Sequence, residues 1–272
     1  MIDYSIIKYP RTPHIEGSRL QPGDEDLSQV PFSAIAGRHI VIEEKVDGAN
    51  TALSFNPEGE LLLQSRGHYL VGGYRERHYD LFKQWAGAHR DQFFEVLGCR
   101  YIMYGEWLYA KHTVYYDALP HYFMEFDILD RETDRFLDTP SRRALTKDLP
   151  VCSVPVLSEG RFTRMDDVLK NLGPSCYITG NKIANLRAAA EKEGVDPERT
   201  LRETDPSNTM EGLYIKVEEG GEVVSRVKYV RSSFLQTVEQ SQSHWLNRPI
   251  IPNGITRTIG DLFMPTLTPG NA

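Results

Sequence analysis

The fold is decided by residues 38–66, which have the sequence RHIVIEEKVDGANTALSFNPEGELLLQSR. Residues 38–46 are rich in β-branched side chains, and residues 51–55 and 60–66 continue with apolar runs of strand length. Between the last two runs lies Asn56-Pro57-Glu58-Gly59, whose composition is typical of a tight turn. The stretch therefore predicts consecutive strands joined by short connections.

A lysine ends the first of these strands, in the hexapeptide Lys45-Val46-Asp47-Gly48-Ala49-Asn50. A lysine amine attacks phosphorus only in its neutral form, and partial burial or nearby cations lower the lysine pKa. The glycine allows a nucleotide to approach the backbone closely. The alternative is a surface lysine before a β-turn, because Asp-Gly is a common hairpin signal. The hexapeptide therefore favours a nucleophilic Lys45 with a lowered pKa, without excluding the surface lysine.

Four further segments of predicted strand carry residue types that suit nucleotide chemistry. They are Gly105-Glu106-Trp107, Phe123–Asp127, Glu211–Lys216 and Arg226-Val227-Lys228. Side chains alternate along a strand, so Arg226 and Lys228 share a face and both can reach one phosphate. Carboxylates at strand ends can bind ribose hydroxyls or a hydrated Mg²⁺. An aromatic ring can stack on a base, and of Phe123 and Phe126, which lie on opposite faces, we choose Phe126.

The other segments place helices between the strands. Apolar spacing predicts helix over residues 76–97 with an interruption near Gly87, over two segments within 164–200, and from about residue 232. The second helix of the 164–200 segment is expected to stop at Gly194, with Pro197 just beyond it. Strands at both ends with helices between them predict a mixed, largely antiparallel α+β domain. The common phosphate-binding loops, G-x-x-x-x-G-K and strand-linked G-x-G-x-x-G, do not occur.

The composition is that of a soluble globular protein, with 40% hydrophobic and 25% charged residues. The net charge of −7 argues against a broad, nonspecific coating of nucleic acid, but a local basic groove remains compatible with it. No apolar run approaches the length of a membrane span, and the first residues lack the apolar core of a signal peptide. We therefore expect a cytoplasmic protein that does not enter a membrane. The three cysteines have no metal-ligand spacing and are expected to be reduced.

The ordered series KVDGAN, SRG, GEW, FMEFD, EGLYIK and RVKYV resembles motifs I, Ia, III, IIIa, IV and V of the covalent nucleotidyltransferases. Within that superfamily the chain is similar to ATP-dependent RNA ligases, whose lysine motif commonly ends in asparagine, as at Asn50. The segment WLYAKHTVYYDALPHYF also resembles bacterial members of this group. The resemblance covers about residues 8–235. It implies an enzyme that joins RNA 5′-phosphate and 3′-hydroxyl ends through a lysyl-AMP intermediate, with ATP and Mg²⁺ (or Mn²⁺) as cofactors.

The resemblance also implies how the nucleoside is bound. Lys45 would be the nucleophile that becomes linked to AMP, and Glu44 would contact the adenine. Phe126 would stack on the base, and Glu106 would bind the ribose hydroxyls. Arg66 would lie near the ribose or near the acceptor end of the RNA.

The remaining implied roles concern the phosphate and the metal. Asn50 would hold water of the catalytic metal, and Glu211 would serve the metal shell, also through water. Arg226 and Lys228 would bind the α-phosphate, with Lys228 acting in catalysis. Relatives often have lysine where Arg226 stands, and a planar guanidinium is not equivalent to a point charge. We therefore assign the closer phosphate contact to Lys228.

In domain terms, the resemblance implies a nucleotidyltransferase domain over residues 1–235, with a helical insert at about 164–206. Residues 236–272 are expected to form a short helix and an irregular tail rather than an independent domain. DNA ligases and mRNA capping enzymes usually carry an OB domain after motif V. Only about 40 residues follow Lys228, which favours an RNA ligase without an OB domain.

Other functions remain open. One alternative is a DNA ligase or another nucleotidyltransferase of the same superfamily, and a second is a protein that self-adenylylates but seals poorly. The third, from a different class, is a nucleic-acid-binding module without catalysis, which would not need both Lys45 and Lys228. The expected partners are RNA ends, with a separate end-healing kinase or phosphatase as a further candidate. The sequence does not define the oligomeric state or the natural RNA.

For two further groups of charged residues, we expect mainly solvent exposure. Of Glu43 and Glu44, one is expected to be solvated and the other to serve the site. On the predicted helical insert, Lys182, Arg187 and Lys192 are expected to form a solvated face.

Overall fold

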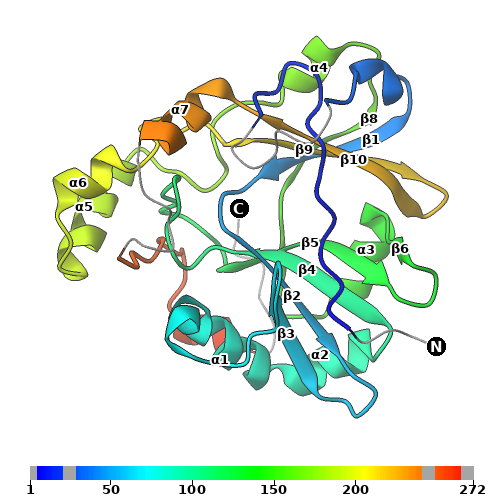
Figure 1. Ribbon diagram of the computed structural model, residues 1–272, viewed down its shortest axis with the longest axis horizontal. Helices are drawn as coiled ribbons and strands as arrows, with labels where there is room; N and C mark the ends of the chain where they lie inside the picture. Colours follow the sequence, from blue (N-terminus) through cyan, green and yellow to red (C-terminus); the bar gives the residue numbers. More distant parts are fainter. Residues whose placement is uncertain (1–4, 21–28, 241–248, 265–272) are drawn as a thin grey trace.

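The protein is built on two antiparallel sheets that face each other, as the computed structural model of residues 5–20, 29–240 and 249–264 shows (Figure 1). The first sheet has the order β10-β9-β1-β8. Its strands are β1 (His39–Lys45), β8 (Val156–Arg161), β9 (Gly212–Glu219) and β10 (Glu222–Val230). The strands predicted around Glu211–Lys216 and Arg226–Lys228 are confirmed, and they form a hairpin with its turn at Gly220 and Gly221, which both have positive φ.

The second sheet has the order β3-β2-β4-β5-β6, and β7 pairs in parallel with β5. Its strands are β2 (Ala49–Phe55), β3 (Leu61–Ser65), β4 (Tyr101–Trp107), β5 (Phe123–Asp130), β6 (Arg135–Phe136) and β7 (Cys152–Ser153). The short connection from β1 to β2 contains Gly48, so the chain passes from one sheet to the other at the predicted lysine motif.

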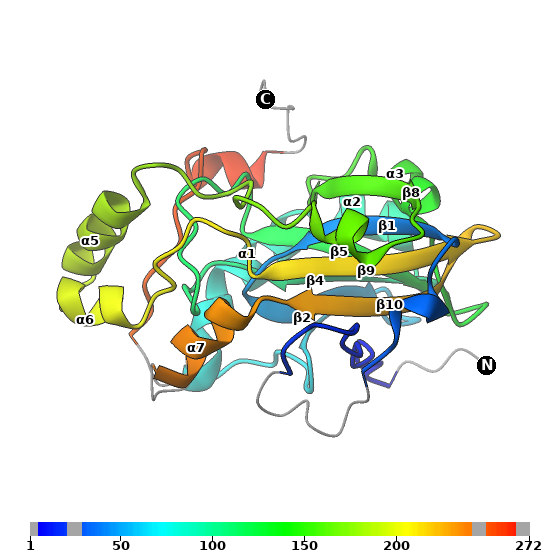
Figure 2. The same ribbon diagram turned by 90° about the horizontal axis from the view of Figure 1, so that it is seen from above.

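Helices cover the sheets and extend from one end of them (Figure 2). The helices beside the second sheet are η2 (Tyr74–Tyr79), α1 (Asp80–Ala88), α2 (Arg90–Leu97), α3 (Thr139–Thr146) and η4 (Gly260–Phe263). Those beside the first sheet or at its end are η1 (Phe32–Ala34), α4 (Met165–Leu169), α5 (Lys182–Lys192), α6 (Pro197–Arg202) and α7 (Ser232–Gln240). The predicted interruption near Gly87 is confirmed by the break between α1 and α2.

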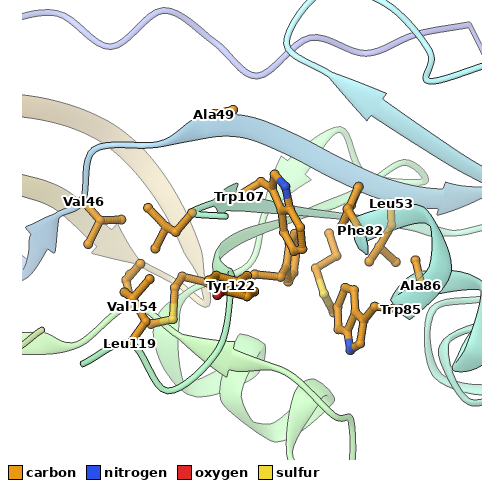
Figure 3. Close-up of a cluster of buried hydrophobic side chains, with 14 of the residues drawn as sticks. Val46, Ala49, Leu53, Phe82, Trp85, Ala86, Trp107, Leu119, Tyr122 and Val154 are labelled. Carbon is orange, nitrogen blue, oxygen red and sulfur yellow. The ribbon is translucent and has the colours of Figure 1, made fainter. Parts of the chain in front are cut away.

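The apolar cores lie on the outer faces of the two sheets. On β1, Ile40 and Ile42 point to a core that also contains residues of β9 and β10. The outer face of the second sheet packs against α1, where Phe82 contacts both Trp85 and Trp107 (Figure 3). Because strand side chains alternate, the residues between these apolar positions face the other sheet. The inner faces carry a smaller apolar cluster around Tyr9 and Tyr104, together with polar and charged groups.

A network of buried charges joins the two inner faces. Glu43 of β1 accepts a hydrogen bond from Arg142 at 2.7 Å and pairs with Lys216 at 2.9 Å, and Arg142 also pairs with Glu125. Lys216 lies 3.1 Å from Asp127 of β5. Burial would raise the pKa of Asp127, but these cations hold it below its ordinary value. Separating the partners of such a buried pair would leave an uncompensated charge, which is strongly destabilising. The network therefore holds the two sheets in a fixed position relative to each other.

This network corrects the expectation for Glu43 and Glu44. Neither side chain is solvated, because both are almost completely buried. A second correction concerns Lys182, which is 1% exposed and donates hydrogen bonds to the backbone carbonyls of Asp205 and Ser207. The expectation of a solvated face holds for Arg187 and Lys192, which are exposed.

Several elements differ from the prediction. The strands β6, β7 and β8 were not predicted, and α4 is shorter than the predicted segment. The predicted stop at Gly194 is confirmed, because α5 ends at Lys192 and Gly194 has positive φ. The helix α6 was not predicted; it begins at Pro197, with the Asp196 side chain accepting from Glu198 N–H as the N-cap. The predicted helix from about residue 232 is confirmed as α7, while Trp245 lies outside the described residues.

The chain after α7, where it is described, is anchored on the connection between β4 and β5. Asn253 accepts the Tyr116 backbone N–H at 2.9 Å and donates to the carbonyl of Leu108 at 2.8 Å. Within the described ranges, no helix has the length and apolar character needed to cross a membrane.

Candidate active site

A cleft of about 1660 Å³ opens between the two sheets where β1 ends. Of the nine residues predicted for the site, eight line it: Glu44, Lys45, Asn50, Arg66, Glu106, Phe126, Glu211 and Lys228. The ninth, Arg226, does not line the cleft. The fold therefore brings together side chains that are up to 184 positions apart, from Glu44 to Lys228.

Lys45 lies at the last position of β1, opposite Gly212 of β9 in the register of the sheet. Its Nζ lies 2.7 and 2.8 Å from the two carboxylate oxygens of Glu211. Burial acts to lower the pKa of Lys45, but Glu211, with Glu106 and Asp47, raises it above its ordinary value. The prediction of a lowered Lys45 pKa is therefore wrong for this arrangement of side chains. Carboxylates, rather than cations, dominate the electrostatic field at the Lys45 amine.

Glu106 lies on β4 beside the connection that follows Lys45. Its Oε1 accepts the Gly48 N–H at 3.1 Å. A Cβ on Gly48 would meet the Trp107 carbonyl oxygen at 2.8 Å and the Glu106 side chain at 2.9 Å, so only glycine fits this close approach. Burial, reinforced by Glu211, raises the pKa of Glu106 to about 8 despite the opposing effect of Lys45. Burial also raises the pKa of Glu211 to about 7.

We expect Glu106→Gln to raise the free energy of unfolding near pH 8 by several kcal/mol and at most about 5 kcal/mol, because each unit of pKa difference is worth about 1.4 kcal/mol. The pKa of Glu106 is about 8 in the folded protein and about 4.3 in an unfolded chain. Between these values unfolding releases a proton, so the wild type loses stability as pH rises through this window. Glutamine keeps the acceptor for Gly48 and removes that cost. Urea unfolding at pH 8 and at pH 4 measures the difference, which should vanish at pH 4. Equal effects at both pH values would contradict the raised pKa.

Asp47 has a positioning role that the sequence analysis missed. Its Oδ2 accepts the backbone N–H groups of Thr113 and Val114, each at 2.8 Å. Its own N–H donates to the Tyr116 hydroxyl at 2.7 Å. These bonds attach the segment after β4 to the lysine loop, so one wall of the cleft is fixed relative to Lys45. The long separation of the partners in sequence left no signal for this contact.

Glu44 is directed away from Lys45, as strand alternation requires. Its Oε1 accepts from the Ser175 hydroxyl at 2.5 Å, and its Oε2 accepts from the Cys176 N–H at 2.9 Å. Burial raises its pKa. Glu44 therefore connects β1 to the segment that precedes α5. The adenine contact implied by resemblance stays a prediction.

The two cations of β10 share a face, as predicted, but have different surroundings. Arg226 lies 3.5 Å from Asp127, and its guanidinium is 4.2 Å from the centre of the Phe136 ring. Lys228 lines the cleft, and its charge opposes in part the rise in the Glu211 pKa that burial causes. The Lys228 backbone donates to the carbonyl of Pro13 and accepts from Ile15 N–H, both at 2.9 Å. The N-terminal segment therefore fixes the part of β10 that carries Lys228.

The aromatic and remaining polar residues lie as follows. Phe123 is completely buried in the core beside α1, whereas Phe126 is partly exposed and lines the cleft. The choice of Phe126 as the cleft aromatic agrees with this placement. Asn50 faces Glu106 across the β2–β4 pair, and the exposed Arg66 lies on the rim.

A hydrated divalent cation fits the polar groups of this cleft. Glu211 is 1% exposed, and its two oxygens face the cleft and the Lys45 amine. Carboxylate and amide oxygens, such as those of Glu211 and Asn50, suit Mg²⁺ or Mn²⁺, and Mg²⁺ usually keeps several waters. No group of three or more His, Cys, Asp or Glu side chains arranged for metal binding occurs within the described residues. The donor set is thus suited to a cation held largely through water.

The comparisons with known proteins agree with this architecture. The model of the RNA ligase family matches residues 38–230, which is more than half of the chain. The chain therefore belongs to the RNA ligase family. A search of curated proteins finds no significant sequence match.

Solved structures of mutant forms of the Naegleria gruberi RNA ligase have a similar fold. The form with ATP and Mn has a TM-score of 0.51 at 18% identity, over 86% of this chain and 59% of that chain. The form with AMP and Mn has a TM-score of 0.52 at 17% identity, over 86% and 59%. An apo form gives 0.52 at 18% identity, over 86% and 58%. The fold is an α+β nucleotidyltransferase domain, and this chain spans less than two thirds of the length of those ligases.

Proposed function

We propose that this protein is an ATP-dependent RNA ligase that joins a 5′-phosphate to a 3′-hydroxyl through a covalent Lys45–AMP intermediate. The observation that carries the proposal is the position of Lys45 in the cleft. Its amine pairs with the carboxylate of Glu211 and is influenced by that of Glu106, and Lys228 lines the same cleft. An amine, a cation and metal-type carboxylates are the groups that nucleotidyl transfer needs, because the chemistry depends on positioning and charge neutralisation.

In the first step, the neutral Lys45 Nζ attacks the α-phosphorus of ATP. The nitrogen–phosphorus bond forms, the bond to pyrophosphate breaks, and the amine loses its proton. Glu211 must first release the ammonium group, because its carboxylate raises the Lys45 pKa. Lys228 would neutralise charge that develops on the transferred group. Phe126 would stack on the adenine, and Arg226 would support Lys228 at the phosphate.

A divalent cation, when bound, would neutralise phosphate charge and favour the deprotonated amine. Glu211 and Asn50 are the residues proposed to hold it through water. Glu106 would bind the ribose hydroxyls, Glu44 would contact the adenine, and Arg66 would lie near the ribose or the acceptor end.

The second and third steps transfer the AMP to RNA and release it. The RNA 5′-phosphate attacks the lysyl-AMP phosphorus and frees Lys45, giving a 5′–5′ pyrophosphate-linked end. The 3′-hydroxyl then attacks the 5′-phosphorus of that end, and AMP leaves as a phosphodiester forms. RNA breaks with other termini would first need a kinase or a phosphatase to provide these ends.

Labelling and sealing assays test the proposal. The protein is incubated with α-labelled ATP, GTP or adenylate-labelled NAD⁺ and with Mg²⁺ or Mn²⁺, and labelled protein is detected after denaturation. Defined nicked RNA, single-stranded RNA and nicked DNA are then supplied with ATP. We expect labelling from ATP and sealing of RNA. Equal labelling from NAD⁺ would contradict the donor assignment, and sealing of DNA alone would favour a DNA ligase.

A further inference from the structure

The segment between β3 and α1 forms part of the cleft rim and has an unusual surface. We define residues 66–79 as the rim segment; it lies between β3 and α1 in Figure 1. Ten of its residues line the cleft, including Arg66, Tyr74 and Arg77. It contains three arginines and one acidic residue, Glu76, on a protein of net charge −7. Glu76 is buried and already pairs with Lys83 at 2.7 Å. The rim segment is therefore locally cationic.

Two apolar side chains stand out from the rim segment. Val71 is 88% exposed and Tyr74 is 79% exposed, the highest values among the large hydrophobic residues that the structure describes. Gly72 and Gly73 between them have φ of 110° and 118°, a backbone conformation that other residues rarely adopt. Glu76 accepts the Gly72 N–H at 2.8 Å, which holds this shape. A pair of exposed apolar groups held in this way indicates a binding surface rather than incidental exposure.

Tyr74 has one ring face covered and one available. The Arg77 guanidinium lies 4.6 Å from the ring centre, within the range of a cation–π contact. The large exposed fraction of Tyr74 leaves the opposite face open to solvent. The end of the segment is firmly held, because Trp107 donates to the carbonyl of His78 at 2.7 Å and Tyr79 is buried. A rigid aromatic ring with a cation behind it is therefore presented at the edge of the cleft.

We propose that the rim segment binds a single-stranded RNA end, with one unpaired base stacked on the open face of Tyr74. Single-stranded RNA is recognised by stacking of splayed bases on aromatic rings, combined with cations that follow the phosphates. Arg77 supplies such a cation beside Tyr74, Arg66 supplies another on the cleft rim, and the cleft connects both to Lys45. Val71 covers the edge of the stacked base or its sugar. The inference rests on the proposed function, because it assigns the RNA substrate of the same cleft.

Fluorescence anisotropy of a labelled single-stranded RNA of about 12 nucleotides tests the inference without ATP or metal. We expect Tyr74→Ala to weaken binding by roughly 5- to 100-fold, as for loss of one base–aromatic stack. Tyr74→Phe should restore most of the affinity, because the ring is kept. Tyr74→Ala should leave the dependence of affinity on salt unchanged. Arg77→Gln should reduce the slope of log affinity against log salt concentration by about one. Val224→Ala, which removes an exposed apolar group from β10, should bind as the wild type does.

The outcomes separate this inference from the proposed function. Wild-type affinity in Tyr74→Ala, or equal losses in Tyr74→Phe and Tyr74→Ala, would overturn the stacking site. Failure of the wild type to bind the RNA would also overturn it. Self-adenylylation with ATP is measured in parallel, and Tyr74→Ala should form the adduct at the wild-type rate. Absence of any adduct in the wild type would refute the ligase mechanism. The anisotropy result would still show whether the rim segment binds single-stranded RNA.

Discussion

Lys45→Ala is expected to abolish the covalent protein–nucleotide adduct and all sealing of unadenylylated RNA ends. The amine of Lys45 is the only group proposed to attack the α-phosphorus, so its loss removes the first step rather than slowing it. The fold should persist, because the remaining Glu211 carboxyl, whose pKa burial raises to about 7, can take up a proton. Denaturing gel electrophoresis after incubation with α-labelled ATP measures the adduct, and circular dichroism measures the fold.

Two control variants make this result specific. Lys45→Arg keeps a cation beside Glu211 but lacks a nucleophilic amine, so it should also form no adduct. Lys192→Ala removes an exposed lysine of α5 and should label normally. Pre-adenylylated RNA supplies the intermediate without the first step, so sealing of that substrate by Lys45→Ala would place the defect in adduct formation. A persistent labelled adduct in Lys45→Ala would refute the assignment of the nucleophile.

Lys228→Ala is expected to slow adenylylation by on the order of 10²-fold, the usual effect of losing one charge contact to the transition state. It should cost more than Arg226→Ala, because Lys228 lines the cleft and Arg226 faces Asp127 and Phe136. Lys228 also opposes the carboxylates around Lys45, since a nearby positive charge disfavours the ammonium form. Its removal should therefore move the rate–pH profile to higher pH. Single-turnover adenylylation across pH measures both the plateau and the shift.

Arg226→Ala provides the comparison. Its loss leaves Asp127 with one cation fewer in the buried network, so this variant should unfold at lower denaturant concentration than Lys228→Ala. Adenylylation rates are compared under conditions where both variants are folded. If Arg226→Ala is then the slower enzyme, or if Lys228→Ala leaves the pH profile unmoved, the roles assigned to the two residues are wrong.

Local patterns predicted the strands that carry the site, because those strands are buried and their side chains alternate. The face shared by Arg226 and Lys228 and the placement of Phe126 in the cleft both follow from this alternation. By contrast, β8 (Val156–Arg161) lies at a sheet edge and none of its residues is fully buried. The sequence of such a strand therefore lacks the regular alternation of apolar and polar residues by which strands are predicted.

The charges of the site could not be predicted in the same way, because they depend on contacts between distant segments. The Lys45 pKa is set by Glu211, which lies 166 positions further along the chain. Lys182 seemed to belong to an exposed helix face, but carbonyl groups more than 20 positions away enclose its ammonium group. Glu43 pairs with Arg142 of α3, which no local pattern connects to β1. Composition and spacing identify the ionisable groups but not the partners that tune them.

The central claim is that the adenylate is carried on Lys45, and peptide mapping of the adduct tests it most directly. The wild-type protein is incubated with ATP and Mn²⁺ without RNA, digested under mildly alkaline conditions that preserve a phosphorus–nitrogen bond, and analysed by mass spectrometry. We predict AMP on the peptide that contains Lys45 and on no other. AMP attached to another lysine, such as Lys216 or Lys228, or the absence of any adduct, would contradict the proposed mechanism.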